Sequence, residues 1–137
     1  MKICLSQINT IVGDIEYNTQ RIIDEIETTR KAGVDLIIFP EMTILGYPPR
    51  DLLFHNKLIN DNLVALERIA AQTRGIGAII GCVVRNPAPV GKGFFNAAVL
   101  CADGGIVSRH YKTLIPAYDV FDEPRYFDPA PSVQKTA

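Results

Sequence analysis

The sequence has few cysteines, little net charge and no long apolar run, and each absence excludes a class of protein. The three cysteines are widely spaced and odd in number, which argues against a disulfide framework or a zinc site. The net charge of −1 gives no electrostatic reason to expect nucleic acid or an anionic membrane surface as a partner. No apolar run is long enough to span a bilayer, and the N-terminus lacks the pattern of a secretory signal. We therefore expect a cytoplasmic protein.

Phosphate-binding and metal-binding motifs are missing as well. The glycines at 75–81 precede a predicted strand instead of leading from a strand into a helix, so they do not form a dinucleotide loop, and no P-loop is present. The two histidines, His55 and His110, are too far apart to suggest a metal pair and are interpreted as structural. We expect no cofactor and no metal in this chain.

What is present fits one α/β domain. The 137 residues are enough for a hydrophobic core, and 47% hydrophobic content is ordinary for a globular protein. Helices are predicted from an Asn18 cap to Gly33 and from an Asn56 cap over about 57–73. Strands are predicted at 2–8, 34–39, 77–85, 95–101 and 106–111, the last two paired antiparallel through a tight turn. Beyond residue 112 we expect a long ordered loop and a tail. This order predicts one mixed sheet with helices on at least one face.

The chain is organised around a glutamate at the end of a buried strand. Residues 34–39 are apolar and rich in branched side chains, which predicts a strand that ends at Pro40, because proline cannot donate to a sheet ladder. Glu41 follows among mostly apolar neighbours. A carboxylate in such surroundings loses solvation, which suits it to base catalysis. The alternative is a solvated loop glutamate that caps a nearby helix.

The loop after Glu41 is predicted to be rigid. Gly46 allows a close turn, Tyr47 carries a hydroxyl on an apolar ring, and two prolines then restrict the backbone. Proline also suits the first turn of a helix, so a short helix is predicted at 50–54. A rigid loop at a strand end is a common support for a catalytic group.

Two motifs carry a resemblance to a known family. They are Phe39-Pro40-Glu41 followed by Gly46-Tyr47-Pro48-Pro49-Arg50-Asp51-Leu52-Leu53, and Arg109-His110-Tyr111-Lys112-Thr113-Leu114-Ile115-Pro116. They resemble the glutamate and lysine motifs of the nitrilase, or carbon-nitrogen hydrolase, superfamily. Segments 47–53 and 118–127 further resemble the glutaminase domain of glutamine-dependent NAD synthetases. The resemblance runs in order along the whole chain.

The resemblance implies a four-layer α-β-β-α sandwich of two facing sheets covered by helices. Residues 1–137 would form a partial glutaminase domain, about its first half. The complete domain would hydrolyse glutamine and pass ammonia to a synthetase domain, which uses ATP and Mg to amidate nicotinic acid adenine dinucleotide to NAD. The implied partners are therefore glutamine, the second half of the domain and the synthetase domain, and a homo-oligomer is expected.

The resemblance also implies roles for five residues. Glu41 matches the base, Lys112 the cation that stabilises the oxyanion, and Glu123 a second glutamate that positions substrate and lysine. Tyr47 and Tyr118 match positions that line the glutamine pocket. From the residues alone, other interpretations stay open: a solvated strand-end charge for the lysine, a loop glutamate paired with a nearby arginine, and ordinary aromatic packing for the tyrosines.

The family nucleophile is a cysteine that follows the lysine motif in a Cys-Glu-Asp context. Cys4, Cys82 and Cys101 instead fall in predicted strands before Lys112 and are interpreted as buried structural residues. We therefore expect this chain alone to be inactive. Two alternatives remain: a stand-alone amidase of the superfamily, and a truncated, non-catalytic binding module. Without a second sheet, one apolar sheet face would lie exposed, so the isolated chain is expected to self-associate or to pair with its missing half.

Overall fold

The structure is a computed structural model and describes residues 1–131. Its elements follow the predicted order of strand, helix, strand, helix and three strands. The strands are β1 (Ile3–Leu5), β2 (Leu36–Ile38), β3 (Gly77–Arg85), β4 (Phe94–Ala102) and β5 (Gly105–Tyr111). The helices are α1 (Ile15–Lys31) and α2 (Asn56–Ala70), with short 3-10 helices η1 (Arg50–Phe54) and η2 (Glu123–Arg125). The predicted tail falls on residues that include 132–137, which lie outside the described part.

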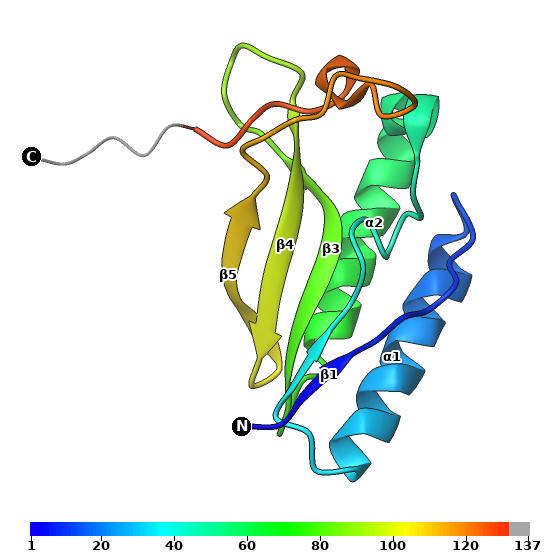
Figure 1. Cartoon of the computed structure of the whole chain (residues 1–137), viewed down its shortest axis with the longest axis vertical. Coiled ribbons are helices and arrows are strands. Elements are labelled where there is room, and N and C mark those ends of the chain that lie inside the picture. The colour runs from blue at the N-terminus through cyan, green and yellow to red at the C-terminus, as the bar shows by residue number, and fades with distance from the viewer. Residues whose placement is uncertain (132–137) are drawn as a thin grey trace, which may run out of the picture.

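All five strands form one mixed sheet in the order β1-β2-β3-β4-β5. The first three strands pair in parallel, and β3, β4 and β5 pair antiparallel. Both helices lie on the same side of the sheet (Figure 1). This follows from the two β-α-β connections, which advance in one direction across the sheet and share one hand. The predicted mixed α/β fold is confirmed.

The topology brings several chain segments to one edge of the sheet. Because β2, β3 and β5 run in the same direction, their carboxyl ends lie at the same edge, together with the amino end of β4. Glu41 follows β2, Lys112 follows β5, and Asn96 lies near the start of β4. Carboxyl ends of strands in open α/β sheets are a common location for binding sites.

The two faces of the sheet differ in how well they are covered. The helix-covered face contributes the main core, which includes Ile22 and Ile26 of α1, Leu66 and Ile69 of α2, and Ile37, Ile80 and Val99 of the sheet. The other face carries one apolar row across four strands, made of Leu5, Ile38, Ile79 and Leu100. Leu5 is 72% exposed, and the other three residues are half-buried. In the described residues this face is open, as expected for one half of a two-sheet sandwich.

Strands β1 and β2 are shorter than the predicted 2–8 and 34–39. Pro40 has no N–H and limits β2, and β1 pairs only with this three-residue strand. Single hydrogen bonds continue past the ladder, from the Ser6 N–H to the Ile38 carbonyl (2.9 Å) and from the Phe39 N–H to the Ile79 carbonyl (3.0 Å). The prediction of strand 77–85 and of a short helix at 50–54 is confirmed.

Both predicted helix caps are wrong. Helix α1 is capped by Asp14, whose carboxylate accepts from the Tyr17 N–H (3.1 Å), and Asn18 lies buried inside the helix. The Asn18 amide instead donates to the carbonyls of Ile11 (2.8 Å) and Ile44 (2.9 Å), so it ties two loops together. Helix α2 begins at Asn56 itself, without a side-chain cap, and ends at Ala70. Within residues 1–131 neither helix is long and apolar enough to cross a membrane.

Candidate active site

Glu41 lies in the turn after β2, where close backbone contacts hold it against β3. A Cβ atom at position 81 would lie 2.3 Å from the Pro40 carbonyl oxygen and 2.8 Å from the Glu41 Cα, so only glycine fits there. Met42 is fully buried and has a φ of 54°, a conformation that costs of order 1 kcal/mol in a non-glycine residue. The burial of Met42 and the close approach of Gly81 together fix the turn that presents Glu41.

Lys112 lies between two carboxylates that are far apart in the sequence. Its Nζ is 2.9 Å from Glu41 Oε1 and 3.1 Å from Glu123 Oε2. The side chains of Glu41 and Lys112 are 45% and 31% exposed, whereas that of Glu123 is 3% exposed. Burial acts to lower the pKa of Lys112, but the hydrogen bonds and charges of the two glutamates raise it overall, so the side chain stays cationic.

The expectation that apolar neighbours desolvate Glu41 is wrong. Nearly half of its side chain is accessible, whereas the residues that follow it in the turn, Met42 to Leu45, are buried. What surrounds the Glu41 carboxylate is a cation and an amide, and it does not cap a helix.

Glu123 is the buried member of the cluster. It begins η2, and its backbone N–H donates to the Pro116 carbonyl (3.1 Å). The Tyr47 hydroxyl donates to Glu123 Oε1 (3.0 Å), and burial, together with this hydrogen bond, raises the pKa of Tyr47, so that the hydroxyl keeps its proton. The alternative pairing of Glu123 with Arg125 does not occur, since Arg125 lies 3.6 Å from Asp51.

Asn96 completes the cluster, and the sequence analysis missed it. Its side-chain Nδ2 donates to Glu41 Oε1 (2.5 Å), and its backbone carbonyl accepts from the backbone N–H of Lys112 (2.8 Å). The residue is 4% exposed and lies within an otherwise apolar strand. That pattern was a usable signal, because a lone amide inside an apolar strand needs a polar partner.

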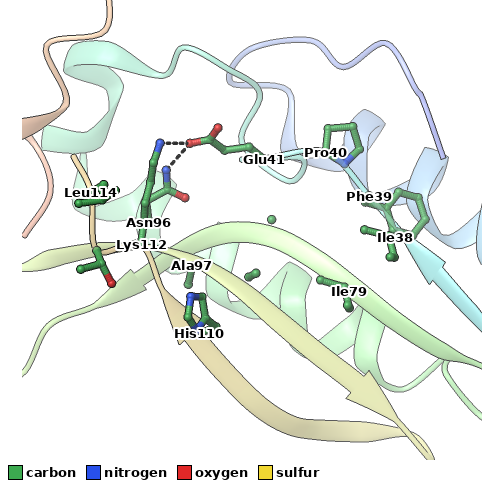
Figure 2. Close-up of a pocket in the computed structure, with 13 residues that line it drawn as sticks. Ile38, Phe39, Pro40, Glu41, Ile79, Asn96, Ala97, His110, Lys112 and Leu114 are labelled. Carbon is green, nitrogen blue, oxygen red and sulfur yellow. Dashed lines mark hydrogen bonds and ion pairs between the residues drawn. The ribbon is translucent and has the colours of Figure 1, made fainter. Parts of the chain in front are cut away.

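A hollow of about 480 Å³ lies beside the cluster and opens toward the uncovered face of the sheet. Its apolar lining includes Ile38, Ile79 and Leu114, and its polar lining comes from Glu41, Asn96, His110, Lys112 and Thr113. Figure 2 shows the Lys112 and Asn96 side chains converging on one oxygen of Glu41. A small polar molecule in this hollow would meet a carboxylate, a cation and an amide side by side.

Tyr118 is the one predicted site residue that the structure does not bring into this cluster. The residue is 70% exposed, and its ring packs edge-on against Phe121, with ring centroids 5.5 Å apart. It lines a neighbouring hollow of about 460 Å³ that also includes Lys112 and Leu114. Tyr118 therefore lines a hollow that it shares with Lys112, whereas Tyr47 contacts Glu123.

No cysteine of the chain lines the hollow beside Glu41. Cys82 and Cys101 are fully buried on the helix-covered face, and burial raises the pKa of their thiols to about 12 and about 11. Cys4 is half-buried and packs against the same core. The thiols of Cys82 and Cys101 are therefore not available as thiolates near neutral pH. Among the described residues, no group of three histidine, cysteine or carboxylate side chains could hold a metal ion.

Comparison with known proteins gives a family match over nearly the whole chain. The family model described as "Carbon-nitrogen hydrolase" matches residues 2–136. Among curated relatives, the glutamine-dependent NAD(+) synthetase of Xanthomonas campestris pv. campestris is 41% identical over 132 residues. That alignment covers 96% of this chain and 23% of the relative. The chain thus spans about a quarter of the length of the curated relatives it matches.

Solved structures show the same fold. The glutamine-dependent NAD(+) synthetase from Cytophaga hutchinsonii superposes with a TM-score of 0.87 at 25% identity, over 96% of this chain and 22% of that one. An amidase from Nesterenkonia sp. superposes with a TM-score of 0.78 at 22% identity, over 96% of this chain and 48% of that one. The second likeness concerns the fold alone.

Proposed function

Because the chain belongs to the carbon-nitrogen hydrolase family, we propose that it forms part of a glutamine amidohydrolase domain in an NAD synthetase. The observation that carries the proposal is the Glu41–Lys112–Glu123 cluster beside a hollow of about 480 Å³. A base next to a fixed cation is the pair of groups that amide hydrolysis needs. The ammonia would pass to a synthetase domain that uses ATP and Mg to form NAD. The similarity of the chain to NAD synthetases supports this use of the ammonia.

In this proposal Glu41 is the general base. It is accessible from the hollow and lies 2.9 Å from the Lys112 ammonium, so it is placed to take a proton from an attacking thiol or water. Lys112 faces the same hollow, where its ammonium donates to the oxygen that becomes negative when the amide carbon turns tetrahedral. One such donor is worth about 3 kcal/mol of transition-state stabilisation.

Glu123 and Tyr47 act on Lys112 and not on the amide. The buried carboxylate of Glu123 holds the ammonium at 3.1 Å, and the Tyr47 hydroxyl holds that carboxylate in turn. Positioning of this kind matters because a donor stabilises the oxyanion only when it already points at it. We propose that Tyr118, on the outer rim beside Lys112, contacts the far end of the substrate.

The nucleophile is proposed to come from a part of the protein beyond these 137 residues. The buried positions of Cys82 and Cys101 support this, as does the resemblance, in which the nucleophile follows the lysine motif. The thiol would give its proton to Glu41 while sulfur bonds to the amide carbon, and that proton would leave on ammonia. Water would then give a proton to Glu41 and attack the thioester, which releases glutamate and restores the thiol.

A stand-alone amidase that acts on another small amide is the second candidate. The accessible hollow beside Glu41 and Lys112 would serve it equally well. A panel of amides separates the two: the intact natural protein that contains this chain is incubated with L-glutamine, L-asparagine or acetamide, and ammonia is measured. The proposal expects ammonia and glutamate in equal amounts from glutamine and much slower release from the others. Preference for acetamide would favour the stand-alone amidase. No ammonia from any amide would favour a non-catalytic module.

A further inference from the structure

The amide of Asn96 contacts the same carboxylate oxygen as Lys112. Nδ2 of Asn96 lies 2.5 Å from Glu41 Oε1, and Nζ of Lys112 lies 2.9 Å from that atom (Figure 2). Within residues 1–131 neither a hydrogen bond nor an ion pair reaches the other oxygen, Oε2. The two oxygens of Glu41 are therefore chemically different: Oε1 accepts two donors, and Oε2 remains free to take a proton.

We propose that Asn96 is a positioning residue that reserves Oε2 of Glu41 as the basic atom. Protonation at Oε1 would break two hydrogen bonds, one of them to a cation, whereas protonation at Oε2 breaks none. The inference rests on the proposed role of Glu41 as a base.

The burial of Asn96 supports a fixed geometry. The residue is only 4% exposed, so its amide cannot exchange Glu41 for water without cost. Its backbone carbonyl accepts from the Lys112 N–H (2.8 Å), so one residue of β4 positions the base through its side chain and the cation through its main chain. A small shift of β4 would disturb both groups together.

Besides the Asn96 amide, several titratable side chains lie around Glu41 and can contribute to the pH dependence of activity. Lys112 contacts it directly, Glu123 and Tyr47 lie behind the lysine, and His110 lines the same hollow. None of these groups is a neutral hydrogen-bond donor to Oε1, so none of them can take over the role of the Asn96 amide. Removing the Asn96 amide leaves the ionised form of Glu41 with one donor fewer, which favours its protonated form.

The test uses Asn96→Leu, Asn96→Asp and the control Asn62→Leu in the intact natural protein. Asn62 is also a buried amide, but it donates to the Val83 carbonyl (2.8 Å) and not to Glu41. For Asn96→Leu we expect kcat/KM for glutamine to fall about tenfold or more, and the acid limb of its pH profile to move to higher pH. Asn62→Leu is expected to lower stability without moving that limb. An unmoved acid limb in Asn96→Leu overturns the proposal.

Asn96→Asp keeps the shape of the side chain and covers the case in which the leucine variant does not fold. An ionised aspartate cannot donate to Glu41 and repels its carboxylate, so we expect the rate near neutral pH to fall at least as far as in Asn96→Leu. Once protonated it can donate to Oε1, so activity should partly return toward acid pH. Loss of activity that is equal at every pH contradicts the proposal.

A spectroscopic readout keeps this inference separate from the proposed function. The intact protein is labelled with 15N-asparagine, and the Asn96 side-chain resonance is identified by its disappearance in Asn96→Leu. We expect this resonance to titrate with pH in the wild type and to stop titrating in Glu41→Gln, even if no glutamine is hydrolysed. A resonance that titrates equally in both overturns the Asn96 inference, whereas absent ammonia release counts only against the proposed function.

Discussion

Replacing Gly81 by alanine should displace Glu41 and thereby test how the turn is held. The new Cβ would lie 2.3 Å from the Pro40 carbonyl oxygen, 2.6 Å from the Met42 nitrogen and 2.8 Å from the Glu41 Cα, although Cβ atoms do not approach closer than 3.0 Å. All three contacts are backbone atoms that cannot rotate away. The turn must therefore move by about 0.7 Å or more, at a cost of about 1–3 kcal/mol.

That shift carries Glu41 away from Asn96 on β4 and from Lys112 after β5. A misplacement of about 1 Å at a reacting group can cost about 100-fold in rate. We expect Gly81→Ala in the intact protein to lose activity by a factor of this order, measured as ammonia release from glutamine. The urea midpoint, followed by circular dichroism, should fall as well.

Gly77→Ala is the matched control because it lies on the same strand. Its Cβ would meet only the Leu36 Cδ1 (3.1 Å) and the Asp35 carbonyl oxygen (3.5 Å), and the nearer atom ends a flexible side chain. Its stability should change by less than about 1 kcal/mol, and its activity should stay near that of the wild type. Equal activity of the two variants would refute the claim that Gly81 positions Glu41.

Three further predictions concern the cluster, a loop and the open sheet face. Lys112→Met leaves the buried Glu123 carboxylate without its cation, so the free energy of unfolding should fall by about 2–4 kcal/mol, measured by urea unfolding; an unchanged midpoint contradicts this. Burial acts to raise the pKa of Asp128, but three donors of the 86–93 loop lower it overall. Its contribution is thus complete above the unfolded value of about 3.9 and is lost as pH falls through the lower folded value. Asp128→Asn should therefore be less stable than the wild type at pH 7 and equal to it in strong acid, and a constant difference in thermal midpoint would contradict this. The isolated 137-residue chain should self-associate through the open sheet face in light scattering, less so with Leu5→Lys; a stable wild-type monomer at high concentration contradicts this.

The sequence predicted those parts of the fold that depend on local patterns. Strand 77–85 and the turn after β4 were predictable because apolar runs and glycine-rich turns act over a few residues. The role of Asn18 was not predictable in this way: it does not cap the helix, because its side chain has partners in two loops, one of them 26 residues away. A residue that suits a cap by type can instead satisfy a distant carbonyl, which single-sequence reasoning does not see.

The candidate site also combines features that local sequence patterns predict with contacts that those patterns do not show. The position of Glu41 after β2 followed from the chain order, but its accessibility depended on the fold of the turn, which buries Met42 to Leu45 and leaves Glu41 accessible. Asn96 reaches Glu41 across 55 residues through the order of strands in the sheet, so the local pattern shows that the amide needs a polar partner but not that the partner is Glu41. Tyr118 was grouped with Tyr47 by resemblance, yet only Tyr47 contacts the cluster in the described residues.

The most direct test of the account is ammonia release from glutamine by the intact natural protein, with wild type and Glu41→Gln compared side by side. Glutamine at position 41 keeps the shape of the side chain but cannot accept a proton. The account predicts that the wild type forms ammonia and glutamate in equal amounts and that the variant loses about 100-fold or more in rate while staying folded. A folded variant that releases ammonia as fast as the wild type would contradict it.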